Sequence, residues 1–509
     1  MGFFRCLSCE GNMIQIICKE ETYQYNIFHI VKAFYPSIEV EQVVHPDSEN
    51  AVEILFDENA SDDVLAVKAE FIKQQSQGEK KIEKYLLDKE VYSFLEKRTG
   101  RSLAWGLLTG VRPTKIAMQK VEEGMDKDSF AEWFKEDALV SEEKATLAYD
   151  IAKREREILS VLDYENGYSL YVGIPFCPSV CSYCSFSSGP LSYWKDSVDD
   201  YVDALCKELR AIGDRSKEKR LNTIYIGGGT PTTLTEEQLE RLLGCIDETF
   251  SREHLKEYTV EAGRPDSITE GKLRVIRAHD VTRISINPQT MQQSTLDRIG
   301  RNHTVQDIID TYELARTLGF DNINMDLIAG LPGETAEDME NTLQQIRKLQ
   351  PDSLTVHSLA IKRAAKMGQQ KSTLGYVEDL REQMSDLEKM ERELTKMIHV
   401  SYETAKEMGL VPYYLYRQKN IAGNFENVGY AKVDKAGIYN ILIMEEKQSI
   451  VAAGAGASTK IVLPEPMVVP GSKNGKKTTL MRVENVKSIR DYILRIDEMI
   501  ERKGEWLWR

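Results

Sequence analysis

Cysteine is scarce in this sequence, with eight residues among 509. A disulfide-bonded scaffold is therefore excluded, because domains that depend on disulfides carry cysteine at a much higher density. A signal peptide is also not expected, since the opening segment MGFFRCLSCEGN has neither a long apolar stretch nor a small-residue cleavage site. These absences together favour a reducing, cytoplasmic setting.

Stretches suited to a lipid bilayer are missing as well. Residues 166–194 carry no charge, but they hold three prolines and three cysteines. Because proline leaves backbone polar groups that lipid cannot satisfy, we expect a buried functional loop there and no membrane span.

Positive charge is in deficit, since 81 acidic residues against 66 lysines and arginines leave a formal net charge of −15. Such a chain is a poor candidate for wrapping nucleic acid over its whole surface, and we expect no nucleic-acid partner. The hydrophobic share of 41% and the charged share of 29% are those of a globular protein. The chain is about three times as long as a typical domain of ~150 residues, so we expect two or three domains.

Strand-like and helical patterns alternate between residues 166 and 365, where we expect the central domain. Short apolar runs rich in β-branched and aromatic residues fall at 169–174, 223–226, 258–260, 283–286, 323–327 and 354–357, with amphipathic helical patterns such as 236–249 and 304–318 between them. Strands that alternate with helices form parallel sheets, and six such units are too few to close an eight-stranded barrel. We therefore expect an α/β fold built on a partial (β/α)6 TIM-like barrel, with its site at the carboxyl ends of the strands.

One further domain is expected on each side of the barrel. Residues 1–165 combine strand-like stretches at 13–17 and 51–56 with charged helical patterns at 61–84 and 141–160, each opening on a serine that could cap a helix. They predict an N-terminal α+β domain. Residues 366–509 begin with a long amphipathic pattern from Leu380 to a glycine stop at Gly409, and predict a C-terminal α+β domain associated with the substrate.

Three cysteines in C-x3-C-x2-C spacing, Cys177, Cys181 and Cys184, form the strongest chemical signal and follow a predicted strand directly. Closely spaced thiolates suit zinc or an iron–sulfur cluster. Structural zinc normally takes four ligands, and no histidine lies nearby in the sequence. A redox disulfide between Cys181 and Cys184 would leave Cys177 without a role. The pattern favours a 4Fe–4S cluster with one open iron, while zinc and metal-free thiols remain as alternatives.

This cysteine motif resembles the signature of the radical S-adenosylmethionine (SAM) superfamily, with Tyr183 at the aromatic position before the last cysteine. The segment GGGTPT at 227–232 resembles the glycine motif that holds the amino group of SAM in that superfamily. The resemblance implies that SAM binds the open iron of the cluster. It implies SAM contacts from Tyr171, Tyr183, Gly228, Gly229, Thr230, Glu261, Gln289, Arg301, Asp326 and Ile328.

Longer segments narrow the resemblance to the oxygen-independent coproporphyrinogen III oxidase group. These are LYVGIPFC at 170–177, GGGTPT, and DLIAGLPGET at 326–335. The segments PYYLYRQKNIAGNFENVGY at 412–430, GAGA at 454–457 and LTGVRPTK at 108–115 resemble the HemZ-type coproporphyrinogen dehydrogenases within that group. The resemblance implies an oxidoreductase that converts two propionate groups of coproporphyrinogen III to vinyls, giving protoporphyrinogen IX in anaerobic haem biosynthesis. It also implies an electron donor such as flavodoxin or ferredoxin.

A substrate with four carboxylates needs local cations in a protein this acidic. Arg417 and Lys419 are candidates, since arginine suits bidentate contact with a carboxylate. Tyr414 and Tyr416 of the same run could face a flat macrocycle, while ordinary aromatic packing in a hairpin remains the alternative reading.

Two positions depart from the pattern of the well-known oxidases. Phe186 stands where those enzymes have a fourth cysteine, as it does in the related haem chaperones, and Gly173 stands where they have histidine. The alternatives are therefore a haem chaperone, an anaerobic haem-ring-opening methyltransferase of the same superfamily, and a protein with a purely structural cluster. The chaperones usually carry a His-Asn-x-x-Tyr-Trp element, and the comparable segment 424–430 has no histidine, which disfavours the first alternative.

Overall fold

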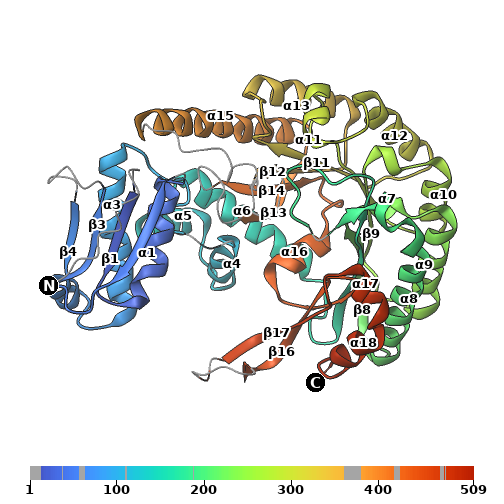
Figure 1. The fold of residues 1–509 in the computed structure, drawn as a ribbon, viewed down its shortest axis with the longest axis horizontal. Helices are drawn as coiled ribbons and strands as arrows, with labels where there is room; N and C mark the ends of the chain where they lie inside the picture. Colours follow the sequence, from blue (N-terminus) through green and yellow to red (C-terminus); the bar gives the residue numbers. More distant parts are fainter. Residues whose placement is uncertain are drawn as a thin grey trace.

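The structure is a computed structural model with a four-stranded and an eleven-stranded sheet (Figure 1). It describes residues 13–36, 38–56, 64–108, 110, 112–186, 188–359, 380–417, 425–469, 475 and 477–508. None of the helices in these ranges combines the length and apolar character needed to cross a membrane.

The smaller sheet belongs to the N-terminal part of the chain, on the left of Figure 1. Its strands are β1 (Met13–Cys18), β2 (Glu39–Val44), β3 (Asn50–Leu55) and β4 (Val64–Lys68), in the order β2-β1-β3-β4. Helices α1 (Glu21–Phe34), α2 (Ala69–Gln75) and α3 (Lys80–Thr99) pack against it. Alternate residues of β1, such as Ile14 and Ile16, enter this core, as expected for a strand with one buried face.

The prediction of one helix over 61–84 is wrong. Within the described residues, Val64–Lys68 pairs antiparallel with β3, and two separate helices follow. Tertiary pairing with a neighbouring strand outweighs the local helical pattern here. The predicted helix at 141–160 is confirmed as α6 (Glu142–Leu159), whose Ser141 cap accepts a hydrogen bond from the Lys144 backbone N–H. It follows α4 (Thr114–Glu122) and α5 (Lys127–Ala138).

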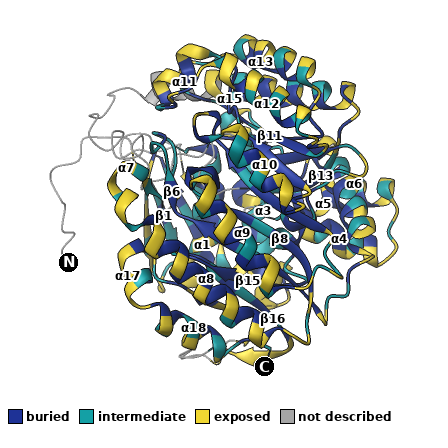
Figure 2. Ribbon diagram, turned by 90° about the vertical axis from the view of Figure 1, so that its right-hand side faces the viewer, coloured by how far each residue is buried: buried dark blue, intermediate teal, exposed yellow. Residues whose placement is uncertain are grey.

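Six parallel strands form the middle of the larger sheet, which confirms the partial (β/α)6 barrel. In spatial order they are β5 (Gly167–Ile174), β8 (Arg220–Gly228), β9 (Glu257–Gly263), β10 (Arg283–Ile286), β11 (Ile323–Ala329) and β12 (Ser353–Ser358). The helices α8 (Val198–Arg215), α9 (Glu236–Thr249), α10 (Glu270–Ala278), α11 (Gln293–Ile299), α12 (Val305–Thr317) and α13 (Ala336–Leu349) surround them, with their exposed residues turned outward (Figures 1 and 2).

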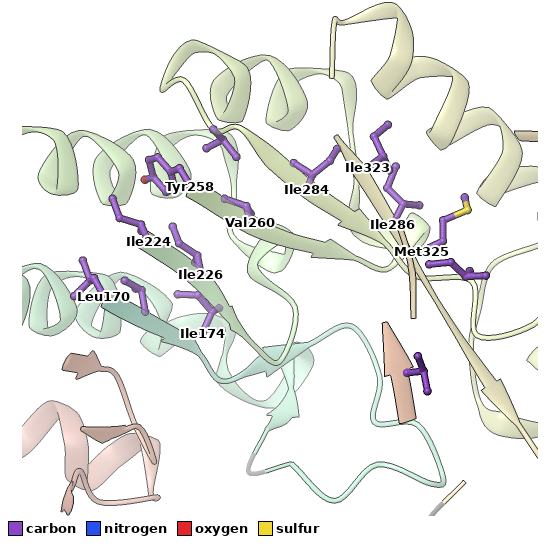
Figure 3. Close-up of a cluster of buried hydrophobic side chains, with 14 of the residues drawn as sticks. Leu170, Ile174, Ile224, Ile226, Tyr258, Val260, Ile284, Ile286, Ile323 and Met325 are labelled. Carbon is purple, nitrogen blue, oxygen red and sulfur yellow. The ribbon is translucent and has the colours of Figure 1, made fainter. Parts of the chain in front are cut away.

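Apolar residues occupy the outer face of these strands, beneath the helices. Figure 3 shows this layer, and its labelled members are Leu170, Ile174, Ile224, Ile226, Tyr258, Val260, Ile284, Ile286, Ile323 and Met325. Because successive residues of a strand point to opposite faces, the residues between them face the barrel interior. The interior set is polar or aromatic and includes Tyr171, Tyr225, Glu261, Arg283, Asp326 and His357.

The C-terminal part of the chain combines helices and strands, and its strands extend the barrel sheet at both edges. β14 (Glu426–Ala431) pairs with β12, and β13 (Val411–Arg417) lies outside it. At the other edge β15 (Ser449–Ala453) pairs with β5, followed by β16 (Ser458–Val468) and β17 (Lys477–Glu484). The helices are α15 (Leu380–Glu407), α16 (Ile438–Glu445), α17 (Ile489–Leu494) and α18 (Ile496–Gly504). The division into domains at 165 and 365 stays a prediction.

Buried polar contacts tie these flanking parts to the barrel. Glu208 of α8 accepts hydrogen bonds from the Gly454 N–H at 2.9 Å and the Tyr492 hydroxyl at 2.6 Å, and it pairs with Lys503. On the opposite side, Glu426 of β14 accepts from Lys144 at 2.6 Å and from the Trp105 indole at 2.7 Å. Removing one partner of such a buried pair would cost about 3–5 kcal/mol, because the other charge would stay buried without compensation.

Candidate functional site

The cysteine loop, residues 175–190, lies at the carboxyl end of β5. Two short strands, β6 (Phe176–Cys177) and β7 (Gly189–Pro190), close its base before α7 (Leu191–Trp194). All three of its cysteines are free thiols. Cys181 is buried, while Cys177 and Cys184 are half-buried. In the part of the chain that the structure describes, no three His, Cys, Asp or Glu side chains form a group that could hold a single metal ion. An iron–sulfur cluster makes a different demand, because each cysteine binds a separate iron.

Hydrogen-bond donors lie next to two of the three thiols, Cys177 and Cys181. The Thr230 hydroxyl lies 3.7 Å from Cys177 Sγ, and Arg264 Nη1 lies 3.9 Å from Cys181 Sγ. The guanidinium of Arg301 also interacts with Cys181 and with the Tyr183 hydroxyl. Thiolate donors with cationic neighbours are what an iron–sulfur cluster takes, so the residues present fit that cofactor.

The glycine loop after β8 packs directly against the cysteine loop. The Gly229 N–H donates to the Ile174 carbonyl and the Thr230 N–H to the Phe176 carbonyl, both at 2.7 Å. A Cβ on Gly229 would lie 2.5 Å from the Phe176 oxygen, and Gly228 has a φ of +107°. Both positions therefore require glycine, which lets the backbone reach the centre of the site.

Glu261, at the end of β9, lies in the buried interior beside this loop. It accepts hydrogen bonds from the Tyr225 hydroxyl and, at 3.3 Å, from the Gly228 N–H. Burial raises the pKa of Glu261 to about 7, even though the hydrogen bond from Tyr225 acts in the opposite direction. This carboxyl is therefore poised to change its charge when a cation binds beside it.

Three tyrosines stack next to Glu261 inside the barrel. The ring centroids of Tyr225 and Tyr439 of α16 lie 4.4 Å apart. The ring centroid of Tyr171 lies 6.3 Å from that of Tyr225 and 6.2 Å from that of Tyr439, and the three rings are nearly parallel. Tyr439 was missed by the sequence analysis, because nothing in its local sequence indicates that α16 packs against a strand about 200 positions earlier.

Gln289, Asp326 and Ile328 come together through the backbone. The Gln289 N–H donates to the Asp326 carbonyl and the Ile328 N–H to the Gln289 carbonyl, both at 2.9 Å. Gln289 adopts a positive φ of 68°, which is uncommon outside glycine and often marks a functional position. Burial alone would raise the pKa of Asp326, but the nearby His357 and a hydrogen bond from Asn324 lower it below the ordinary range. Asp326 therefore carries a negative charge at neutral pH.

Arg301 and Tyr183 lie where the cysteine loop, which contains Tyr183, meets this group. Tyr183 packs on the apolar cluster of Ile299, Ile328 and Leu331. Arg301 is 6% exposed, and its Nη1 donates to the Asn287 carbonyl at 2.5 Å. Its Nε is buried and finds no partner among the described residues, so it can donate a hydrogen bond to a bound ligand.

The predicted substrate residues separate into two groups. Tyr416 faces the interior, where its hydroxyl lies 3.1 Å from His357 Nδ1, and Tyr414 stacks on it at 6.3 Å. Arg417 points to the opposite face of β13, is 3% exposed, and donates to the Leu108 carbonyl at 2.7 Å. Its role as a substrate ligand stays a prediction, as does that of Lys419, which lies outside the described residues.

His357 joins the site although the sequence analysis did not select it. It is the next-to-last residue of β12, and its side chain points inward between Tyr416 and Asp326, whose Oδ1 lies 3.9 Å from His357 Nε2. The sequence did hold a signal for His357, since the alternation of the strand at 354–357 places residue 357 on the polar face.

A separate cleft of about 1580 Å³ lies between the N-terminal part, α15 and β14, and none of the predicted site residues is among the residues that line it.

Comparison with known proteins agrees with this geometry. The sequence profile of the radical SAM superfamily matches residues 171–346. The oxygen-independent coproporphyrinogen-III oxidase-like protein HemZ of Bacillus subtilis is 43% identical over 376 residues, which are 73% of this chain and 72% of that protein. The heme chaperone HemW of the same organism is 38% identical over 196 residues, which are 38% of this chain and 50% of that protein.

Among solved structures, the coproporphyrinogen III oxidase HemN from Escherichia coli, described there as a radical SAM enzyme, aligns with a TM-score of 0.50. It is 21% identical, and the alignment covers 66% of this chain and 70% of that one, so the likeness concerns the fold. The match to the superfamily identifies a 4Fe–4S cluster and SAM as the cofactors. With HemZ similar over nearly three quarters of both chains, this chain belongs to the radical SAM superfamily, in the family of oxygen-independent coproporphyrinogen-III oxidase-like proteins.

Proposed function

We propose that this protein is an oxidoreductase that decarboxylates two propionate side chains of coproporphyrinogen III to vinyl groups, giving protoporphyrinogen IX in anaerobic haem biosynthesis. One observation carries the proposal. The similarity to HemZ extends over 376 residues, far beyond the 176 of the superfamily match at 171–346, whereas the similarity to HemW covers 196. Because substrate-binding residues lie largely outside the shared cofactor core, extended similarity supports a shared substrate class.

The cysteine loop and the strand ends would divide the work of holding the cofactors. Cys177, Cys181 and Cys184 would ligate three irons of the cluster, and the glycine loop would hold the amino group of SAM. Arg301 Nε, which is buried without a partner among the described residues, would receive the carboxylate of SAM. Bound there, the cluster and SAM would supply the radical chemistry that removes a hydrogen atom from the substrate.

The interior side chains would orient the ligands and exclude water. The tyrosine stack of Tyr171, Tyr225 and Tyr439 fills the space next to Glu261 with aromatic rings, which protects a radical from solvent. On β12 and β13, His357 and Tyr416 would offer hydrogen-bond donors for a propionate carboxylate. The electron that cleaves SAM would come from a reduced flavodoxin or ferredoxin in a reducing cytoplasm, and the electron that the substrate loses together with carbon dioxide would pass to a one-electron acceptor.

A haem chaperone is the second candidate. HemW is 38% identical to this chain over the shared region, and Phe186 stands at the position where the well-known oxidases have cysteine. Phe186 is 69% exposed within the cysteine loop, so it is free to contact a flat ligand or a partner protein. A chaperone would bind haem tightly and release no carbon dioxide from coproporphyrinogen III.

An anaerobic assay tests the proposal. The reconstituted protein is given reductant, SAM and coproporphyrinogen III, and 5′-deoxyadenosine and porphyrin products are followed by mass spectrometry. We expect mono- and divinyl products that disappear in Cys181→Ala and persist in Cys245→Ala, a matched change of a buried cysteine on α9. Deoxyadenosine without decarboxylated porphyrin contradicts the proposal, as does haem binding without SAM cleavage.

A further inference from the structure

Arg264 is the residue immediately after β9, and it connects the cysteine loop to the barrel. It is 3% exposed. Its Nη1 donates to the Ser179 carbonyl at 2.8 Å and to the Ser179 hydroxyl oxygen at 2.9 Å. The same nitrogen lies 3.9 Å from Cys181 Sγ. One buried guanidinium therefore contacts both the backbone between Cys177 and Cys181 and the thiol that follows it.

Asp266 fixes the orientation of this guanidinium. Its carboxylate accepts from Arg264 Nε at 2.9 Å and from Nη2 at 2.6 Å, a bidentate arrangement that leaves Nη1 directed at the cysteine loop. His303, whose side chain is fully buried, places Nδ1 3.8 Å from Asp266 Oδ1. A buried arginine held on one side by a carboxylate cannot swing away from Ser179 without losing that pair.

The cysteine loop is fastened from a second direction at the same residues. The Ser179 hydroxyl donates to the Gly300 carbonyl at 2.9 Å, and the Ser182 N–H donates to the Ile299 carbonyl at 3.1 Å. Arg301, next in the chain, approaches Cys181 from this side. Two buried guanidiniums thus flank one thiol, and the resemblance accounts for only one of them, Arg301, as a SAM contact.

We propose that Arg264 is a positioning residue for the 4Fe–4S cluster. It holds the segment between Cys177 and Cys181 in the conformation that presents both sulfurs, and its positive charge beside Cys181 stabilises the reduced cluster. Cationic and hydrogen-bonding groups next to cluster sulfurs favour the state with the extra electron, which makes reduction easier. The inference rests on the presence of the cluster and holds whichever tetrapyrrole is the substrate.

Redox titration of the cluster, followed by electron paramagnetic resonance without SAM or substrate, tests this role. In Arg264→Met we expect a more negative midpoint potential, so that the ratio of reduced to oxidised cluster at a fixed potential falls several-fold. Arg264→Lys keeps the charge and should recover most of that ratio. Arg274→Met, which removes a largely exposed arginine of α10, serves as the matched control and should not change it.

Iron release to a chelator tests the structural half. We expect several-fold faster release from Arg264→Lys and from Ser179→Ala, because each loses part of the Arg264–Ser179 contact while the charge remains. A wild-type potential in Arg264→Met together with wild-type release rates in the other two overturns the proposal. If Arg264→Met cannot be purified, Asp266→Asn replaces it, and unchanged release in Asp266→Asn and Arg264→Lys overturns it equally. Neither readout requires turnover, so failure of the decarboxylation assay leaves both results interpretable.

Discussion

The outer and inner faces of the strands β5 to β12 differ in almost every chemical property. The outer face is a continuous apolar layer under the helices, as Figure 3 shows. The inner face of the same strands carries carboxylates, tyrosines, an arginine and a histidine. Because side chains alternate along a strand, one short segment can serve the core and the site at once. We therefore expect substitutions on the two faces to have separable effects, on stability outside and on ligand binding inside.

The largest effect is expected on the outer face. Ile284→Ala removes a fully buried side chain of β10 and should lower the free energy of unfolding by about 2–5 kcal/mol through lost burial and a residual cavity. Chemical denaturation measures this change. Val411→Ala, at an exposed position on β13, is the matched control and should cost much less. A parallel loss of SAM affinity in the folded Ile284→Ala protein would show that the faces are not separable.

On the inner face, Glu261→Gln should weaken SAM binding and leave the free energy of unfolding nearly unchanged. The amide keeps the shape and a hydrogen-bond acceptor for Tyr225, so folding stability should be retained. Loss of the negative charge should weaken SAM binding by about 1.5–3 kcal/mol, roughly 10- to 100-fold, the value of a hydrogen bond to a charged group. Anaerobic equilibrium binding of SAM measures it. Wild-type affinity would exclude Glu261 from the SAM site.

The pH dependence of SAM binding sharpens the same point. Since burial raises the pKa of Glu261 to about 7, the carboxyl is mostly protonated at pH 6 and mostly ionised at pH 8. A cationic ligand prefers the ionised form, so affinity should rise as pH increases, by about tenfold between these values. The ligand-free protein should lose stability as pH rises from about 4.5 to about 7 and then level off, because the unfolded state ionises first and a buried carboxylate without a cation is costly. Glu261→Gln should remove both trends, and a persistent trend would point to another group.

The smallest effect is expected at β12 and β13, where His357 contacts Tyr416. His357→Gln removes one donor next to Tyr416 and should raise the KM for coproporphyrinogen III by about fivefold, as the loss of ~1 kcal/mol of hydrogen bonding would. SAM cleavage without substrate should be unchanged. His399→Gln, an exposed histidine on α15, is the control. A fall in kcat with an unaltered KM would place His357 in the chemical step instead.

Local patterns made half of this architecture predictable from the sequence. The six strands and the cysteine loop were found because period-two alternation and motif spacing lie within a few residues of each other. The positions of β14 and β15 at the two edges of the barrel sheet could not be found that way. They depend on pairings such as Ser449 with Tyr168, which join residues far apart in the sequence.

The same limit applies to the site. Cys177, Cys181 and Cys184 share one loop, and their spacing in the sequence is enough to identify them. Arg264, in contrast, contacts Ser179, which lies 85 positions earlier in the chain. A single arginine after a strand carries no such signal, and only the folded structure shows that its guanidinium is buried against the cysteine loop. Arg417 illustrates the converse, because its residue type suited a carboxylate while its strand face directs it to the carbonyl of Leu108.

One isotope experiment tests the central claim most directly, that the inner face presents a propionate side chain to a radical generated beside the cysteine loop. Coproporphyrinogen III deuterated at the propionate β-carbons is incubated anaerobically with the reconstituted protein, reductant and SAM, and the 5′-deoxyadenosine is analysed by mass spectrometry. We predict deuterium in 5′-deoxyadenosine together with vinyl-bearing product. Unlabelled 5′-deoxyadenosine with intact coproporphyrin would contradict this account.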